Sequence, residues 1–366
     1  MPDAVPAPFA AEPRSDRWGS VSLGTSKGHS RPNSLGLLLV LCLTGLLPVR
    51  YVKGAVEERF EFHERRMGTE FRIILYASEP AEARRAAWLA FQRAEELEQI
   101  LSGYREESEL RRAEEAASER PVVLSRELFR VLRLALVLAY TTDGAFDPTV
   151  KPLAEVWKRT ISEGRLPGRD ELAEARGRVG YRNVWLNSRT RALRFGRPDV
   201  TVDLGGLGKG FAAEEMWRIL HDLGQPRSLV DAGGDLRLGS PPPGREAWRV
   251  ELEDGLAGPK ILYLRDCAVA TSGDGRQAVE IQGRRYSHLV DPRSGDALPY
   301  RVTACVVAPD GALADGLATA LSLVEEARLG EIVSSWKGVE ARVVREEEGR
   351  IQQWQSVGFA DLTRRK

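Results

Sequence analysis

The spacing of hydrophobic residues changes near residue 225, and this change constrains the fold more than any other feature. Upstream, apolar residues recur three and four positions apart, as on one face of an amphipathic helix. From Ser228 onward they fall in short alternating runs, which are typical of half-buried strands. The pattern therefore predicts an α+β fold, a single large domain of mainly antiparallel sheets with helices packed against them, and not a doubly wound parallel sheet.

Local signals place the individual elements. One helix is expected after Ser78, a candidate N-cap, with Pro80 in its first turn. A second begins at Ser125, and a third covers about 209–223 with Gly224 at C′. The remaining expected elements are strands at 56–62 and 71–76 around a Met67-Gly68-Thr69 turn, later strands at 248–252, 261–264, 278–281, 302–307, 339–344 and 354–357, and a helix near 315–326.

Composition excludes several classes of function. Lys+Arg and Asp+Glu both number 53, so the formal net charge is zero and no global field attracts nucleic acid. The 3 cysteines form no CxxC pair, and the chain has no HExxH motif, which argues against the common zinc sites. Cys267 and Cys305 are expected to be buried thiols, with a disulfide between them as the alternative. Any phosphate-binding site must therefore be local.

The N-terminus resembles an export signal. Residues 35–47 are almost entirely apolar and follow several basic residues, but the run is shorter than the ~20 residues of a spanning helix. We expect residues 1–33 to be a disordered leader and 34–55 to be a signal-peptide h-region or an uncleaved signal anchor. The functional domain would then occupy residues 56–366, exported and lying at the outer face of the membrane.

The segment Val202–Gly210, VDLGGLGKG, predicts a strand that enters a glycine-rich turn and opens a helix. Glycines let the backbone approach a ligand closely, and a helix N-terminus offers free N–H groups to an anion. Asp203 and Lys209 add one charge of each sign. The segment matches neither the Walker A motif nor GxGxxG, so a tight turn without a ligand remains the alternative.

Two further segments carry residues for a cation and a base. In ADGLATAL, Asp315 and Thr319 are four residues apart, so on a helix their oxygens could meet one hard cation, although Asp315 could instead be a helix cap. In YSHLVDPRSG, His288 is a candidate general base that Asp291 could orient, or a structural histidine of the turn.

Two segments offer contacts to a planar ligand. GAFDPTVKPL is a rigid turn in which Asp147 could bind a ligand or form an Asx turn. Tyr104 follows a helix end and could stack on a flat ring, or simply lie at the surface.

Taken together and in this order, the motifs resemble the FAD:protein FMN transferase (ApbE) family over residues 67–321. The motifs are Met67-Gly68-Thr69, Ser102-x-Tyr104, Ser108-Glu109-Leu110, GAFDPTVKPL, VDLGGLGKG, DAGGDL (231–236), ATSGD (270–274), SHLVDPRSG and ADGLATAL. Two segments depart from the family pattern: no Asn follows Ser108-Glu109-Leu110 closely, and Trp157 is followed by Lys158-Arg159 and not by Gly-Phe.

The resemblance implies an enzyme of two subdomains that splits FAD and attaches FMN to a Thr or Ser of a partner protein, with AMP as leaving group and Mg²⁺ as cofactor. The implied acceptor is a subunit of a membrane redox complex at the periplasmic face. The implied FAD contacts are Met67, Tyr104, Ala145, Phe146, Asp147, Asp203, Lys209 and Leu289. The implied Mg²⁺ ligands are Asp315, Thr319 and the carbonyl of Gly206, with His288 assisting transfer.

Two other functions stay open at this point. The chain could be an FAD-binding envelope protein that only hydrolyses FAD to FMN and AMP, using the same Asp315, Thr319 and His288. It could also be a non-enzymatic envelope protein, although the intact set of polar residues at every motif argues against that.

Overall fold

The computed structural model describes residues 56–252, 256–258, 260–273 and 278–364. The predicted leader, the 34–55 segment and Asp274 lie outside the described residues. Within the described part, no helix has the length and apolar character needed to cross a membrane.

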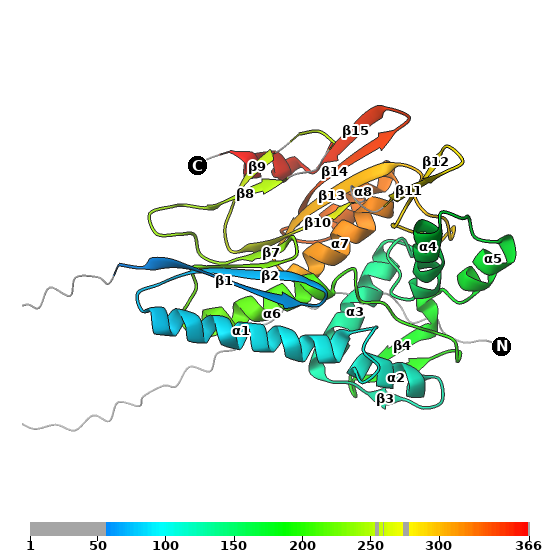
Figure 1. Cartoon of the computed structure of the whole chain (residues 1–366), viewed down its shortest axis with the longest axis horizontal. Helices are drawn as coiled ribbons and strands as arrows, with labels where there is room; N and C mark the ends of the chain where they lie inside the picture. Colours follow the sequence, from blue (N-terminus) through cyan, green and yellow to red (C-terminus); the bar gives the residue numbers. More distant parts are fainter. Residues whose placement is uncertain (1–55, 253–255, 259, 274–277, 365–366) are drawn as a thin grey trace, which may run out of the picture. The chain divides into compact units, whose positions relative to one another are not determined.

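An eight-stranded sheet forms the centre of the domain, in the order β1-β2-β6-β7-β10-β13-β14-β15 (Figure 1). Each neighbouring pair is antiparallel. The strands are β1 (Glu58–Arg66), β2 (Thr69–Ala77), β6 (Ser228–Ala232), β7 (Asp235–Leu238), β10 (Cys267–Gly273), β13 (Arg301–Ala308), β14 (Glu340–Glu347) and β15 (Arg350–Gln355).

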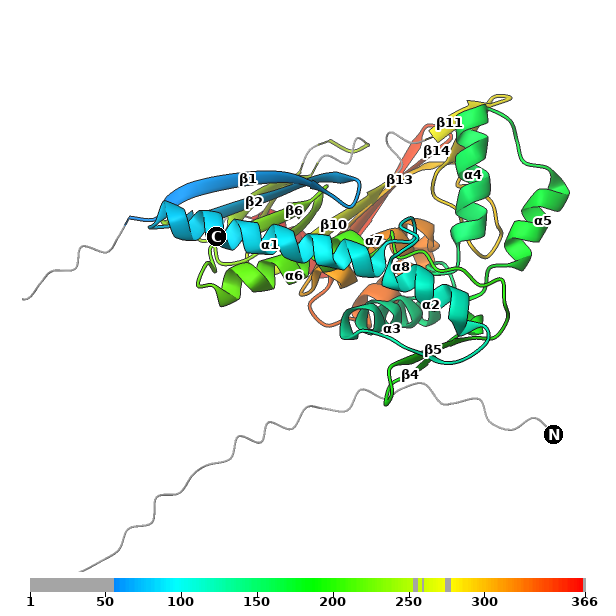
Figure 2. The same cartoon turned by 60° about the horizontal axis from the view of Figure 1, so that its bottom comes forward.

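The two faces of this sheet are covered differently. The helices α1 (Pro80–Leu101), α6 (Gly208–Asp222), α7 (Gly311–Leu323) and α8 (Glu326–Ser334) pack on one face, where they enclose the main core (Figures 1 and 2). The hairpin β8 (Trp248–Leu252)–β9 (Lys260–Leu264) and the 3₁₀ helix η2 (Val357–Thr363) cover the other. β2 shows the alternation that this requires, since Ile73 faces the main core and Ile74 the second one.

A smaller layer adjoins the helical side. It contains α2 (Glu109–Ala117), α3 (Arg126–Thr141), the 3₁₀ turn η1 (Tyr181–Asn183) and a three-stranded sheet of β3 (Val122–Val123), β5 (Ala192–Phe195) and β4 (Val184–Asn187). The helices α4 (Lys151–Glu163) and α5 (Arg169–Gly177) project beside the hairpin β11 (Ala278–Ile281)–β12 (Arg284–Ser287) (Figure 2). A third apolar cluster around Trp157 joins α4 and α5 to residues 286–297.

The α+β prediction is confirmed, and so are the strands with clear alternation. Several boundaries were wrong. Ser78 does not cap α1, because Glu79 is the N-cap residue and its side chain makes no cap hydrogen bond. The helix expected near 315–326 is α7, which begins at Gly311, because the side chain of Asp310 accepts from the amides of Ala312 and Leu313. The expected strand at 354–357 ends at Gln355, and Val357 begins η2.

The short helices α2, α4, α5 and α8 were not predicted. Cys267 and Cys305 form no disulfide; Cys305 is buried and Cys267 half-buried. The prediction of buried thiols therefore holds fully for Cys305 alone.

Candidate active site

The glycine-rich segment lies where the chain turns into α6. Residues 201–204 belong to no sheet, so the predicted strand is wrong, and α6 begins at Gly208. The approach to the turn is held by Glu114, whose Oε1 accepts from the amide of Val202 at 2.5 Å. Asp203 closes the turn, because its Oδ1 accepts from the amide of Gly205 at 2.7 Å.

Two glycines bring the starts of α6 and α7 together. A Cβ on Gly210 would lie 2.2 Å from the carbonyl oxygen of Gly311, and a Cβ on Gly311 would lie 2.2 Å from that of Gly210. No other residue fits this contact. It places Asp315 beside the first turn of α6, where its Oδ2 accepts from the amide of Gly210 at 3.0 Å.

The predicted metal ligands of α7 both face the segment that begins α6, since Asp315 contacts Gly210 and Thr319 contacts Gly206. Asp315 lies inside α7 and is buried, so the alternative of a helix cap is wrong for it. Thr319, one helical turn further on, donates from Oγ1 to the carbonyl oxygen of Gly206 at 3.4 Å. A Cβ on Gly206 would lie 3.3 Å from Thr319 Oγ1, so the absent side chain makes room for this approach.

This donor set fits Mg²⁺ by its chemistry. A carboxylate, a hydroxyl and a carbonyl are hard oxygen ligands, and Mg²⁺ is bound by few protein groups plus water or phosphate oxygens. The described residues contain no cluster of three or more His, Cys, Asp or Glu side chains suited to a metal.

Lys209 lies between two carboxylates at the same place. Its Nζ is 2.6 Å from Asp235 Oδ2 and 3.7 Å from Asp315 Oδ2. Burial opposes the charge of Lys209, but Asp315 and Asp235 together raise its pKa above the ordinary value. Asp235 had no role in the sequence prediction. The sequence feature that could have identified it is the DAGGDL motif, in which Asp235 follows two glycines of positive φ.

Two of the predicted flavin contacts, Phe146 and Tyr104, contact or adjoin the glycine-rich turn. Phe146 is buried, and its ring edge would lie 3.2 Å from a Cβ on Gly206, so the 145–147 turn borders the glycine-rich turn. Tyr104 is 82% exposed, and the neighbouring Asp203 carboxylate raises its pKa. The ammonium of Lys158 lies 5.9 Å from the centre of the Tyr104 ring.

Met67 occupies the turn between β1 and β2 with φ of 48°. That turn contacts the one before Asp235, because a Cβ on Gly233 would lie 2.7 Å from the Thr69 side chain. Ala145 is fully buried beside Phe146. The site is thus bordered by segments that are far apart in the sequence.

Both carboxylate oxygens of Asp147 accept hydrogen bonds from other groups of the protein. Oδ1 accepts from the amide and the hydroxyl of Thr149 at 2.8 and 2.6 Å, and Oδ2 accepts from the amide of Tyr181 at 3.0 Å. Burial raises the pKa of this carboxyl, and these hydrogen bonds counteract the effect. The Asx-turn interpretation accounts for these contacts, and a ligand contact through Asp147 stays a prediction.

His288 and Leu289 follow β12. His288 is half-buried, while Leu289 is buried in the main core that also contains Phe146. Asp291, the expected partner of His288, forms an ion pair with Arg293 at 2.7 Å. The guanidinium of Arg293 contacts both carboxylate oxygens, and an orienting role of Asp291 toward His288 stays a prediction. The role of His288 as a base stays a prediction.

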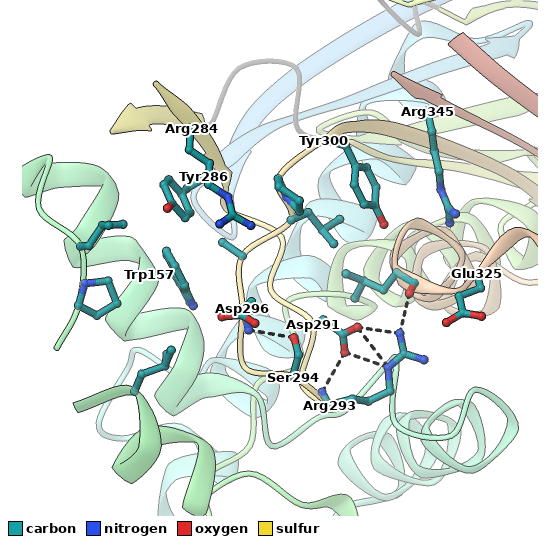
Figure 3. Close-up of a pocket in the computed structure, with 17 residues that line it drawn as sticks. Trp157, Arg284, Tyr286, Asp291, Arg293, Ser294, Asp296, Tyr300, Glu325 and Arg345 are labelled. Atoms are coloured by element: carbon teal, nitrogen blue, oxygen red, sulfur yellow. Dashed lines mark hydrogen bonds and ion pairs between the residues drawn. The ribbon is translucent and has the colours of Figure 1, made fainter. Parts of the chain in front are cut away.

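A cavity of about 560 Å³ opens beside the segment that follows His288 (Figure 3). On one wall, the rings of Trp157 and Tyr286 stack at 5.4 Å. Arg293 bridges Asp291 and the carbonyl oxygen of Leu323 at the end of α7. None of the predicted flavin or metal contacts lines this cavity, which is therefore a separate feature.

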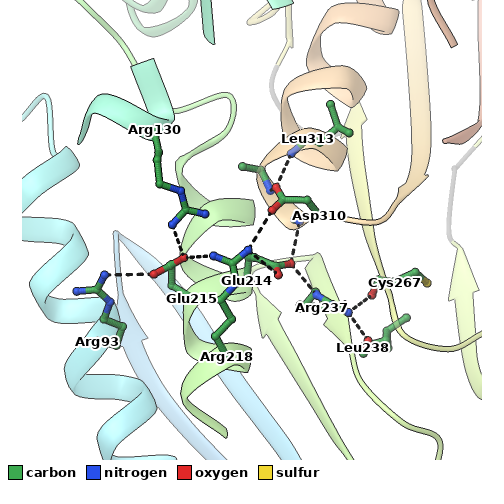
Figure 4. Close-up of polar contacts among 12 residues, drawn as sticks. Arg93, Arg130, Glu214, Glu215, Arg218, Arg237, Leu238, Cys267, Asp310 and Leu313 are labelled. Atoms are coloured by element: carbon green, nitrogen blue, oxygen red, sulfur yellow. Dashed lines mark hydrogen bonds and ion pairs between the residues drawn. The ribbon is translucent and has the colours of Figure 1, made fainter. Parts of the chain in front are cut away.

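A second charged cluster lies further along α6, and its carboxylates are surrounded by arginines (Figure 4). Glu214 pairs with Arg237 of β7 at 2.6 Å. Three arginines from α1, α3 and α6 surround Glu215: Arg93, Arg130 and Arg218. This cluster joins α1, α3, α6 and β7, and each of its two carboxylates is paired with arginine.

The comparisons with known proteins agree with this geometry. Residues 67–343 match the model of the ApbE family. A Treponema pallidum protein named FAD:protein FMN transferase is 30% identical over 75% of this chain and 81% of its own length. A Vibrio cholerae protein of the same name is 33% identical over 64% of this chain and 72% of its own.

Solved structures show the same fold. The flavin transferase ApbE of Vibrio cholerae superposes with a TM-score of 0.74 at 27% identity, covering 84% of this chain and 99% of that one. The Thermotoga maritima ApbE protein gives a TM-score of 0.73 at 29% identity, covering 84% and 100%. This chain belongs to the ApbE family.

Proposed function

We propose that this chain is a magnesium-dependent FAD:protein FMN transferase. It is a flavin transferase by family and by the names of its relatives. The observation that supports the magnesium dependence is that α7 places Asp315 against the amide of Gly210 and beside Lys209, and Thr319 against the carbonyl of Gly206. Oxygen ligands next to a helix N-terminus and an ammonium group suit a cation bound together with a diphosphate.

Mg²⁺ held by Asp315, Thr319 and Gly206 would supply charge neutralisation at the FAD diphosphate. Lys209 adds positive charge at the same phosphates. FAD would lie along Met67, Tyr104, the 145–147 turn, Asp203 and Leu289, with the exposed Tyr104 stacking on a planar ring.

The reaction exchanges one phosphorus–oxygen bond for another. His288 accepts the proton of a Thr or Ser hydroxyl on the acceptor, and that oxygen attacks the phosphorus of the FMN half. The bond to the AMP phosphate breaks, and AMP leaves with its charge stabilised by the site. Positioning and charge neutralisation supply most of the rate in phosphoryl transfer, which matches a site without a nucleophile of its own.

We further propose that the acceptor is a subunit of a membrane redox complex and that the chain works at the periplasmic face of the inner membrane, anchored or released after cleavage. The apolar run at 35–47 behind basic residues supports export.

The defining experiment incubates the full chain with FAD, Mg²⁺ and candidate acceptors, and follows both products. Mass spectrometry is expected to find FMN on an acceptor Thr or Ser, with AMP released in equal amount. Removing Mg²⁺ with a chelator should abolish both. AMP release without any labelled acceptor would instead show FAD pyrophosphatase activity alone, and lack of FAD binding would exclude both activities.

A variant tests the base. His288→Ala is expected to lower FMN transfer by about 10²- to 10⁴-fold, because general-base catalysis contributes about that much. FAD binding, followed by flavin fluorescence, should change little. Transfer at the wild-type rate would show that another group, or water, takes the proton.

A further inference from the structure

Asp235 occupies an unusual place for a carboxylate. It begins β7, directly after Gly233 and Gly234, whose φ values of 69° and 104° turn the chain sharply from β6. Its side chain is buried, at 4% exposure, and points toward α6. Burial and the nearby Asp315 both disfavour its charge, which Lys209 offsets.

Asp235 and Asp315 both lie within ion-pair distance of the ammonium of Lys209. Its contact with Asp235 is a hydrogen bond of 2.6 Å, whereas Asp315 is 3.7 Å away, beyond hydrogen-bond distance. The lysine side chain is 33% exposed, and its ammonium already lies within ion-pair distance of Asp315. Loss of the hydrogen bond to Asp235 would leave Asp315 as the nearer of the two carboxylates that bind it.

Such a pairing would compete with the cation. An ammonium in contact with the Asp315 carboxylate would weaken Mg²⁺ binding there, because the two positive charges repel each other and compete for the same carboxylate. Asp315 is the only carboxylate among the proposed ligands. The cation affinity of the site therefore depends on where Lys209 is held.

We propose that Asp235 is a positioning residue that holds Lys209 away from Asp315 and so keeps the Asp315 carboxylate available to the cation. The inference rests on the proposed cation site and deepens it. Asp235 touches neither cation nor flavin in this scheme and acts through Lys209.

The test measures cation binding without turnover. Mn²⁺ is titrated into the full chain in the absence of FAD at pH 8, and the free ion is followed by electron paramagnetic resonance. Asp235→Asn, which keeps the size of the side chain, is expected to weaken Mn²⁺ binding about 10- to 100-fold, as loss of a residue that orients a ligand does. Asp231→Asn is the matched control, because this carboxylate of the same motif pairs with Arg72 at 3.0 Å and should change affinity less than about twofold.

A second pair of variants separates positioning from simple loss of charge. In a Lys209→Met background no ammonium can move onto Asp315, so Asp235→Asn should change Mn²⁺ affinity less than about threefold. If the full loss persists in that background, Asp235 acts through its own charge or as a ligand, and the inference is wrong. Equal affinities of wild type and Asp235→Asn would also overturn it.

The proposed function is tested separately in the same titration. If the wild-type chain binds no Mn²⁺, the cation site itself fails, and the inference with it. Thermal unfolding of each variant without metal checks that the chain is folded, so a weakened affinity is read only from folded protein.

Discussion

Two ion pairs join the same two elements, α6 and β7, with opposite polarity. Near the start of α6, the helix contributes the cation Lys209 and the strand the anion Asp235, at 2.6 Å. Further along, the helix contributes the anion Glu214 and the strand the cation Arg237, also at 2.6 Å. Asp235 and Arg237 are two positions apart on β7, so both side chains face the helix.

The surroundings of the two pairs differ. The Glu214–Arg237 pair is almost fully buried on both sides, and the adjacent Glu215 is enclosed by arginines. The Lys209–Asp235 pair lies beside a further carboxylate, Asp315, and Lys209 is partly exposed. We expect the Glu214–Arg237 pair, in which each buried charge has a partner, to contribute to stability. Asp315 is a second carboxylate beside one ammonium, and it is therefore a candidate ligand for an external cation.

The largest effect on FMN transfer is expected at Asp315, the second carboxylate beside Lys209. Asp315→Ala removes the only charged ligand of the proposed cation and should lower FMN transfer by about 10²- to 10⁴-fold. FMN attachment and AMP release are the measurements. Asp310→Ala is the control on the same helix: it removes the N-cap and should cost about 1 kcal/mol of stability while leaving transfer per folded molecule within about twofold. Wild-type transfer by Asp315→Ala would show that the proposed metal site is wrong.

A change in the Glu214–Arg237 pair should alter the stability of the protein and not its rate of FMN transfer. Arg237→Met leaves Glu214 buried next to fewer charges and is expected to lower the free energy of unfolding by about 3–5 kcal/mol. Urea unfolding measures this loss. Adding Glu214→Gln to the same chain should recover part of it, because no buried charge is then left unpaired. A rate defect in folded Arg237→Met protein would remove the distinction between the two pairs.

The two clusters should also shift stability in opposite directions with pH. Burial and Asp315 raise the pKa of Asp235 to about 7, so the folded chain binds more protons than the unfolded chain between about pH 4 and 7, and stability falls as pH rises there. Burial opposes ionisation of Glu215, but Arg130 and its neighbours hold the pKa of that carboxyl below 4.5, so its contribution is lost as pH falls below that value.

Urea midpoints between pH 3 and 8, measured without metal, check this. Asp235→Asn should flatten the decline toward neutral pH, and Glu215→Gln should flatten the decline toward acid. If both variants flatten the same side of the curve, the two clusters do not differ as described.

The smallest effect is expected at the rim of the site. Tyr104→Ala removes an exposed ring and should weaken FAD binding about fivefold, or about 1 kcal/mol, as aromatic contacts do. Tyr104→Phe keeps the ring and is the control for the hydroxyl. Flavin fluorescence quenching measures both, and an equal loss in the two variants would assign the effect to the hydroxyl.

The sequence was most informative where the signal is local. The strands expected at 248–252 and 278–281 match the bounds of β8 and β11, and along β8 burial alternates from residue to residue as the pattern predicts. Ser125 caps α3 as expected, because its side chain accepts from the amide of Leu128 within one turn. Helical spacing alone correctly placed Asp315 and Thr319 on one face of α7.

What the sequence could not give depends on distant contacts. Gly210 was interpreted as part of a ligand loop, but its missing side chain admits the Gly311 carbonyl. Asp235 is separated from Lys209 by 26 residues, and no spacing rule connects them. The ion pair of Asp291 with Arg293, two residues further on, was not predicted either.

The contact between Gly210 and Gly311 has a consequence for how the protein is made. The carboxylate of Asp315 lies 105 positions from the amide it accepts from, and Thr319 lies 113 positions from Gly206. A chain still being synthesised N-terminus first has the glycine turn before it has α7. Under the proposed function, the cation ligands would therefore come together only after Thr319 has been added to the chain.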